Sequence, residues 1–240
     1  MSRAWGQIAR AAFLRGLPGC GGGFGLLISV LDCRAGACYT MHEKYPFGAW
    51  KRRNTMMLET ERLLLRPWTE ADAPACFRYA KDPRVGPRAG WLPHKDEAES
   101  RQIIRDVLAV PETFAIIWKE TGLPIGCVGL NFHTYVSKGD DEAELGYWLG
   151  VPWWGRGIMP EAARALLRHA FEDLGLARVW CCFFAGNEQS KRVQEKLGFR
   201  YQRTIEKIPI PRLNETRDDV VNLLTREEWM EIAHRENLPK

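Results

Sequence analysis

Apolar and polar positions follow regular periods from Met57 onward, and these periods predict the secondary structure of the first half of the chain. A short apolar run at 62–68 predicts a strand, and two runs within 113–132 predict a hairpin about a Thr-Gly turn. The segment 69–82 opens on a threonine N-cap followed by acidic residues, and 95–110 carries its apolar residues on one side. Both segments are therefore predicted to be helices.

The second half of the chain alternates between the two periods. Strands are predicted at 143–150 and 177–184, helices at 160–174 and 187–199, and a last strand at 200–211. Strands in series followed by strand, helix, strand, helix and strand are typical of an α+β protein with a mixed sheet. The strands on either side of the helix at 160–174 are expected to form a parallel pair.

Residues 1–55 differ from the rest, because they contain clustered glycines and show no helical or strand period. Their apolar stretch FGLLISVL is too short to span a bilayer, and no small-residue cleavage site follows it cleanly. We predict an unstructured extension or a translated leader over 1–55 and one folded domain over 57–232. Lys-Arg-Arg at 51–53 can be encoded by a purine-rich ribosome-binding sequence, so the natural product is expected to begin at Met56 or Met57.

Composition narrows the class of protein. The chain of 240 residues is 45% hydrophobic, which is enough for one sizeable core. The formal net charge of +4 originates in the basic segment 1–55, so it gives no argument for a nucleic-acid partner. Association with a membrane is not expected either, because no apolar run is long enough to span a bilayer.

The cysteines favour a reducing compartment. The chain has seven, an odd number, and Cys181 and Cys182 are neighbours in a predicted strand, so their side chains point to opposite faces. Reduced thiols in a cytoplasmic protein fit this best. Cys33, Cys38 and His42 could form part of a zinc site, but no second ligand pair follows at a suitable spacing, so no metal is expected.

The stretch GYWLGVPWWGRGIMPEAARALL, at 146–167, is a candidate anion site. A strand runs through Gly155 and Gly157 directly into a helix, which presents backbone N–H groups and the positive end of the helix dipole at one point. Diphosphate is the usual occupant of such a site. The stretch lacks the Lys-Ser/Thr of a P-loop and the third glycine of a Rossmann turn. Taken alone, it could be a tight turn before a helix.

Five motifs in order resemble the GNAT superfamily of acyl-CoA-dependent N-acyltransferases, and within it the RimJ/RimL-like branch. They are ETERLLLRP, AELGYWLG, WGRGIMPEA, AFEDLGLARV and NEQSKRVQEKLGF, and the resemblance extends over 58–229. The resemblance implies the GNAT fold, an α+β fold whose mixed, mostly antiparallel sheet has a splayed parallel strand pair and flanking helices. It also implies an enzyme that moves an acetyl group from acetyl-CoA to an amine.

In this family the glycine bend binds the pyrophosphate of acetyl-CoA, and the pantetheine arm lies between the splayed strands. Trp154 stands where Arg or Gln is frequent in the superfamily, and Met159 stands where Gly or Ala is usual, so its bulk is expected to crowd the helix start. The cofactor residues that the resemblance implies are Leu149, Val151, Trp154, Gly155, Arg156, Gly157, Ile158, Met159 and Asn187.

Acyl transfer to an amine requires removal of a proton from nitrogen, stabilisation of an oxyanion, and a proton for the departing thiolate. Glu144 matches the glutamate that takes the proton in family members, and Glu142, two residues away on the same face, is its rival. A backbone N–H between Tyr147 and Leu149 would stabilise the oxyanion.

On the thiolate side, many GNAT enzymes use a tyrosine in the helix before Gly-Phe, and Gln194 stands in that place here. The RimJ/RimL-like branch instead has an Asn-x-x-Ser pattern, matched by Asn187 and Ser190, with the serine near the sulfur. The alternative is that both residues only cap a helix. A covalent acyl-enzyme on Cys181 or Cys182 is a further alternative, although no histidine lies nearby in sequence to activate them.

The acceptor is the least specified part of the function. Within 86–99, Trp91 and His94 are candidates to line the acceptor site, together with Tyr147 on the strand. Three hypotheses remain: acetylation of a protein N-terminal α-amine, acetylation of a small amine such as a polyamine, amino acid or antibiotic, and a non-catalytic acyl-CoA-binding protein. A homodimer is compatible with each.

Overall fold

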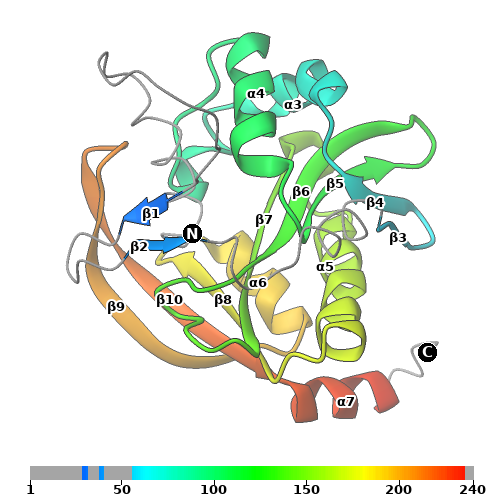
Figure 1. Cartoon of the computed structure of the whole chain (residues 1–240), viewed down its shortest axis with the longest axis vertical. Helices are drawn as coiled ribbons and strands as arrows, with labels where there is room; N and C mark the ends of the chain where they lie inside the picture. Colours follow the sequence, from blue (N-terminus) through cyan, green and yellow to red (C-terminus); the bar gives the residue numbers. More distant parts are fainter. Residues whose placement is uncertain (1–28, 32–37, 41–55, 236–240) are drawn as a thin grey trace.

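A computed structural model describes residues 29–31, 38–40 and 56–235. Its main feature is an eight-stranded sheet in the order β3-β4-β5-β6-β7-β8-β10-β9 (Figure 1). The strands are β3 (Leu58–Glu59), β4 (Leu63–Pro67), β5 (Thr113–Trp118), β6 (Leu123–Asn131), β7 (Glu142–Leu149), β8 (Arg178–Phe184), β9 (Arg200–Ile210) and β10 (Glu215–Thr225). Neighbouring strands are antiparallel, except for β7 and β8, which are parallel.

Helices cover both faces of this sheet. They are α3 (Ala73–Ala80), α4 (Glu97–Ile103), α5 (Ile158–Arg168), α6 (Glu188–Lys196) and α7 (Arg226–Arg235). Along β5, Ala115 and Ile117 pack in the cluster with α3 and α4, whereas Phe114 and Ile116 pack in the cluster with α5. This alternation follows the two-residue period of a strand and explains why β5 is buried almost throughout.

The parallel pair diverges partway along its length. Pairing between β7 and β8 runs from Glu142 opposite Arg178 to Glu144 opposite Trp180. β7 then continues to Leu149 and β8 to Phe184, with α5 beginning shortly after β7 ends. The predicted α+β class, mostly antiparallel sheet and splayed parallel pair are therefore confirmed.

The structure differs from the predicted elements in three places. β10 and α7 follow the strand that was predicted to be last, and β10 lies between β8 and β9, so β9 is an edge strand. The helix predicted at 69–82 is split into a 3-10 turn, Glu70–Asp72, and α3. α5 begins at Ile158 rather than at Pro160, because the left-handed Gly157 is its N-cap.

Within 1–55 the structure describes a short antiparallel pair, β1 (Ser29–Leu31) and β2 (Cys38–Thr40), which the sequence pattern does not predict. Cys33 and His42, which were considered as zinc ligands, lie outside the described residues. Among the residues that the structure describes, no three His, Cys, Asp or Glu side chains gather as metal ligands would. No helix in this part of the chain combines the length and apolarity needed to cross a bilayer. The domain boundary near Met57 stays a prediction.

Candidate active site

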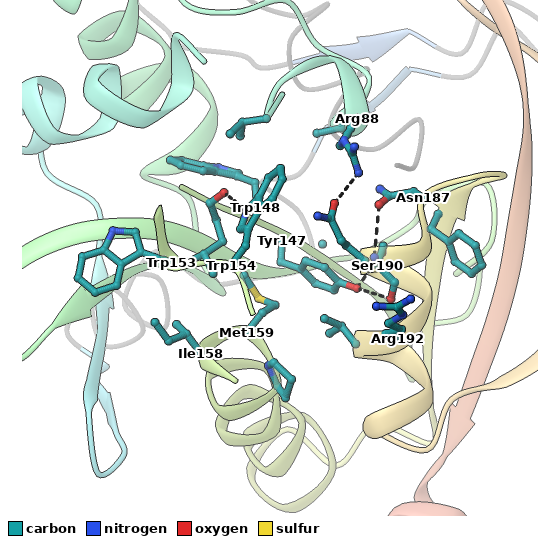
Figure 2. A pocket seen from close by; sticks show the side chains of 18 of the residues that line it. Arg88, Tyr147, Trp148, Trp153, Trp154, Ile158, Met159, Asn187, Ser190 and Arg192 are labelled. Carbon is teal, nitrogen blue, oxygen red and sulfur yellow. Dashed lines mark hydrogen bonds between the residues drawn. The ribbon is translucent and has the colours of Figure 1, made fainter. Parts of the chain in front are cut away.

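A cavity of about 620 Å³ opens where β7 and β8 diverge. The loop into α5, the start of α6 and the 3-10 turn Pro87–Ala89 complete its walls (Figure 2). The residues predicted for the site that line it are Glu144, Tyr147, Leu149, Trp154, Gly155, Gly157, Ile158, Met159, Asn187 and Ser190. The fold thus brings most of the predicted residues together around one space.

The glycine loop has the backbone geometry of an anion site. Gly155 and Gly157 have φ values of 76° and 73°, in the left-handed region that favours glycine. Gly157 is the N-cap of α5, and no side chain caps that helix, so its first N–H groups face outward. A Cβ on Gly155 would meet no protein atom within 4 Å, which leaves room for a ligand at the loop. Met159 is only 5% exposed and packs into the core, so its bulk is accommodated.

A clasp from the first strands holds this loop in place. The Arg62 side chain donates from Nε to Glu161 on α5 at 2.7 Å and from Nη1 to the Arg156 carbonyl at 3.1 Å. Thr60 Oγ1 donates to the same Glu161 carboxylate at 2.6 Å. Although burial raises the pKa of Glu161, the hydrogen bonds from Thr60 and Arg62 lower it overall. The clasp gives the ETER motif a structural role that its sequence did not reveal.

Two tryptophans stiffen the turn before the glycines. Trp154 Nε1 donates to the Leu149 carbonyl at 2.8 Å, and Trp153 Nε1 donates to Tyr79 Oη at 3.1 Å. Two predicted cofactor residues lie off the cavity wall. The Val151 side chain packs with the α3 and α4 cluster, and Arg156 lies over the Trp153 ring.

The backbone of β7 offers N–H and C=O groups to the cavity beyond Glu144. The Leu145 carbonyl accepts from Cys181 Sγ on β8 at 3.3 Å, and the Leu149 carbonyl accepts from Trp154. Because backbone groups alternate sides along a strand, Tyr147 directs its N–H to that same side. The pairing between β7 and β8 ends before Tyr147, so this N–H faces the opening.

The two candidate carboxylates have different surroundings. Glu144 is 1% exposed and lines the cavity. Glu142 accepts hydrogen bonds from Arg178 Nε at 2.7 Å and Trp180 Nε1 at 3.0 Å, which tie it to β8. Burial raises the pKa of Glu142, but the bonds from Trp180 and Arg178 lower it below its ordinary value. Of these two residues, only Glu144 is placed to meet a ligand.

A hydroxyl network joins β7 to α6. Asn187 caps α6 by accepting from the Ser190 N–H at 3.3 Å, and Tyr147 Oη lies 2.9 Å from Ser190 Oγ (Figure 2). Gln194 Nε2 donates to the same Ser190 Oγ at 3.2 Å. Burial raises the pKa of Tyr147 well above its ordinary value, so the residue stays a phenol.

Trp91 and His94 lie behind the wall rather than on it. His94 is 7% exposed, and its Nδ1 lies 2.8 Å from Ser100 Oγ. Burial lowers the pKa of His94 to about 4, so its ring is neutral. Trp91 packs edge-on against Trp148 with ring centroids 6.1 Å apart. Both aromatic rings are used for packing, which sequence alone could not distinguish from recognition.

The same segment still contributes to the wall through earlier residues. Arg84, Val85, Arg88 and Ala89 line the cavity, and the Arg88 guanidinium lies over the Trp154 ring and donates to Gln189. These positions carry no motif, and only their place in the loop GPRAG or just before it could have suggested them.

Neither cysteine on β8 has the surroundings of a nucleophile. Cys181 and Cys182 are buried, and that burial raises the pKa of each thiol well above its ordinary value. Cys182 does reach the cavity wall, but among the described residues no histidine lines that wall. An acyl-enzyme on either thiol therefore finds no support in this site.

The fold and the site together define the acyltransferase class of α+β proteins, in which a splayed strand pair faces a glycine loop at a helix N-terminus. The family model for the acetyltransferase (GNAT) domain matches residues 62–200. The chain belongs to this family and is an N-acetyltransferase, and the family uses acetyl-CoA as its acetyl donor.

Relatives and solved structures agree with this assignment. An uncharacterized N-acetyltransferase of Bacillus licheniformis, p20, is 33% identical over 148 residues, which are 60% of this chain and 82% of that protein. The ribosomal-protein-S5-alanine acetyltransferase of Vibrio fischeri has a TM-score of 0.57 at 21% identity over 72% of this chain and 98% of its own. Mycobacterium smegmatis RimJ in complex with CoA-disulfide has a TM-score of 0.59 at 21% identity over 77% and 90%. The two structures show a shared fold of RimJ-like type.

Proposed function

We propose that this protein transfers an acetyl group from acetyl-CoA directly to a primary amine, with both substrates bound at once. One observation carries the proposal: a single cavity joins an uncapped helix N-terminus, a buried carboxylate and a pair of hydroxyls. These are an anion site, a base and a donor, which acyl transfer to an amine requires.

The cofactor assignment follows from the glycine loop. The loop 155–159 would hold the pyrophosphate through backbone N–H groups, where the dipole of α5 favours negative charge. Arg192 and Lys196 of α6 line the same cavity and add positive charge for phosphate groups. The pantetheine arm would lie between β7 and β8, with Asn187 beside it. Bound acetyl-CoA supplies an activated acetyl group that is attached to a thiol with a pKa of about 8.5.

The amine side of the reaction is assigned to β7. Glu144 accepts a proton from the attacking nitrogen, directly or through water, and the Tyr147 N–H is placed to donate to the oxyanion that forms. An α-amino group has a pKa of about 8 and a lysine of about 10.4, so an α-amine makes the smaller demand on the base. The sulfur side is assigned to Ser190, which donates to the departing thiolate.

The charge of the cavity bears on the acceptor. Among the described lining residues that are not assigned to the phosphate groups, Glu144 is a carboxylate, whereas Arg84 and Arg88 are cationic. A polycationic polyamine is disfavoured there, because like charges would repel it. We therefore propose a protein N-terminal α-amine; the Vibrio fischeri relative in fold is named for an alanine of ribosomal protein S5. A cytoplasmic location and a homodimer stay predictions, as does the alternative of a non-catalytic acyl-CoA-binding protein.

The test begins with acetyl-CoA and a panel of N-terminal peptides, polyamines and amino acids, with release of free thiol as the readout. On the best acceptor, Glu144→Gln should lower the rate at neutral pH by about 10²-fold or more, and less as rising pH deprotonates the amine unaided. Glu142→Gln is the matched control, since it changes a neighbouring buried carboxylate away from the cavity. A pH-dependent defect in Glu142→Gln but not in Glu144→Gln would reassign the base to Glu142. If the wild-type protein acetylates no amine, the alternative of a non-catalytic acyl-CoA-binding protein is favoured.

A further inference from the structure

Two side chains hold the Ser190 hydroxyl, and a third supports one of them. Tyr147 reaches it from β7 at 2.9 Å, and Gln194 reaches it from the next turn of α6 at 3.2 Å. Gln194 is fully buried and is itself held by Asn222 of β10, whose Nδ2 donates to Gln194 Oε1 at 2.7 Å. Ser190 thus lies at the end of a chain of side chains that begins inside the sheet.

The direction of the hydrogen bonds that Gln194 makes follows from its partners. Because Asn222 donates to Gln194 Oε1, the amide nitrogen of Gln194 must face the other way. It donates to the Cys182 carbonyl at 3.4 Å, an atom that can only accept, and to Ser190 Oγ. Gln194 therefore occupies one lone pair of the Ser190 oxygen.

Tyr147 can occupy the second lone pair. Its hydroxyl has the Ser190 carbonyl as another acceptor at 3.3 Å, and the contact with Ser190 Oγ at 2.9 Å is the shorter of the two. When Tyr147 donates to Ser190 Oγ, both lone pairs of that oxygen are filled, and its own hydrogen is free to point towards the cavity that Ser190 lines. Incoming hydrogen bonds also polarise a hydroxyl and make it a better donor.

We propose that Tyr147 and Gln194 are positioning residues that orient and polarise the Ser190 hydroxyl as a hydrogen-bond donor to the leaving sulfur. This inference rests on the proposed acetyl transfer. As the carbon–sulfur bond breaks, its electron pair stays on sulfur, and the Ser190 O–H donates to that charge. The amine gives one proton to Glu144, that proton passes through solvent to the thiolate, and Ser190 keeps its own hydrogen, so the cycle conserves protons. The role of Gln194 is to orient the serine.

The experiment is a double-mutant cycle in the full chain, with single-turnover rates on the best acceptor. Tyr147→Phe keeps the ring and should lower the rate about 5- to 10-fold, with acetyl-CoA affinity unchanged. In a Ser190→Ala background, Tyr147→Phe should lower the single-turnover rate less than about twofold, because Tyr147 acts through Ser190. Gln194→Met should show the same dependence on Ser190. Tyr201→Phe removes a tyrosine hydroxyl on the exposed face of β9 and is the control.

A change of leaving group separates this role from a structural one. A selenol is a stronger acid than a thiol, so its anion departs with less help from a donor, and the Tyr147→Phe defect should shrink towards wild type with the selenoester of CoA. Two results would overturn the inference while leaving acetyl transfer intact. The first is that the rate losses of Tyr147→Phe and Ser190→Ala multiply in the double variant, and the second is that Tyr147→Phe lowers the rate equally with the thioester and the selenoester. A wild-type protein that acetylates no amine would overturn the proposed function and this inference with it.

Discussion

Replacement of Arg62 by methionine tests whether the clasp on the glycine loop matters for cofactor binding. Arg62 lies outside the cavity, yet it joins Glu161 of α5 to the carbonyl of Arg156 in the loop. Methionine keeps an unbranched side chain and removes every side-chain donor of Arg62, while the backbone N–H of residue 62 and Thr60 Oγ1 still donate to Glu161. The loop would keep its glycines but lose the Arg62 hydrogen bond that fixes its position relative to α5.

The size of the effect follows from the geometry. The Arg62 side chain is 37% exposed, so solvent screens its salt bridge with Glu161, and the pair is worth about 1 kcal/mol or less. The bond to the Arg156 carbonyl adds about 1 kcal/mol. The free energy of unfolding should therefore fall by about 1 to 2 kcal/mol, which corresponds to a fall in Tm of several degrees. If most of this energy preorganises the loop, the Kd for acetyl-CoA should rise about 3- to 10-fold.

Isothermal titration calorimetry measures the Kd for acetyl-CoA, and thermal unfolding measures stability separately. Arg105→Met is the matched control, because Arg105 forms a comparable salt bridge with Glu70 at 2.8 Å away from the cavity. The control should lose little stability and no affinity. An Arg62→Met protein that binds acetyl-CoA as tightly as the wild type would refute the reasoning and reduce the clasp to a contribution to stability.

Two further predictions concern the loop and the buried histidine. Gly157→Val should weaken acetyl-CoA binding about 10-fold or more, because a β-branched residue is strained at a φ of 73° and would distort the loop whose backbone N–H groups form the anion site; unchanged affinity in a folded variant would refute the cofactor assignment. Burial lowers the pKa of His169, but hydrogen bonds to Glu112 and Asp173 raise it overall. Protonated His169 therefore stabilises the fold fully below a pH of about 6.5, and this stabilisation is lost as pH rises through the folded pKa. His169→Gln should lower the free energy of unfolding, measured by chemical denaturation, by roughly 3 kcal/mol at pH 6 and by less at pH 9. An equal cost at both pH values would show that His169 contributes by packing alone.

The sequence by itself determined the features that depend on neighbouring residues. The strand, glycine turn and helix at 146–167 form one contiguous stretch, so the local periods and the two glycines were enough to predict these elements in this order. The same holds for the buried stripe of α5, in which Ala163, Leu166 and Leu167 are fully buried as their spacing indicates.

Only the tertiary structure decided which of these residues meet. Arg62 contacts Glu161 across 99 positions, and Tyr147 contacts Ser190 across 43, because sheet order and the packing of helices bring distant segments together. Glu142 and Glu144 share a face of one strand, but Arg178 from β8 engages the first and leaves the second on the cavity wall. A local pattern specifies which face of an element is buried, whereas the identity of the partner on that face depends on long-range contacts that no short stretch encodes.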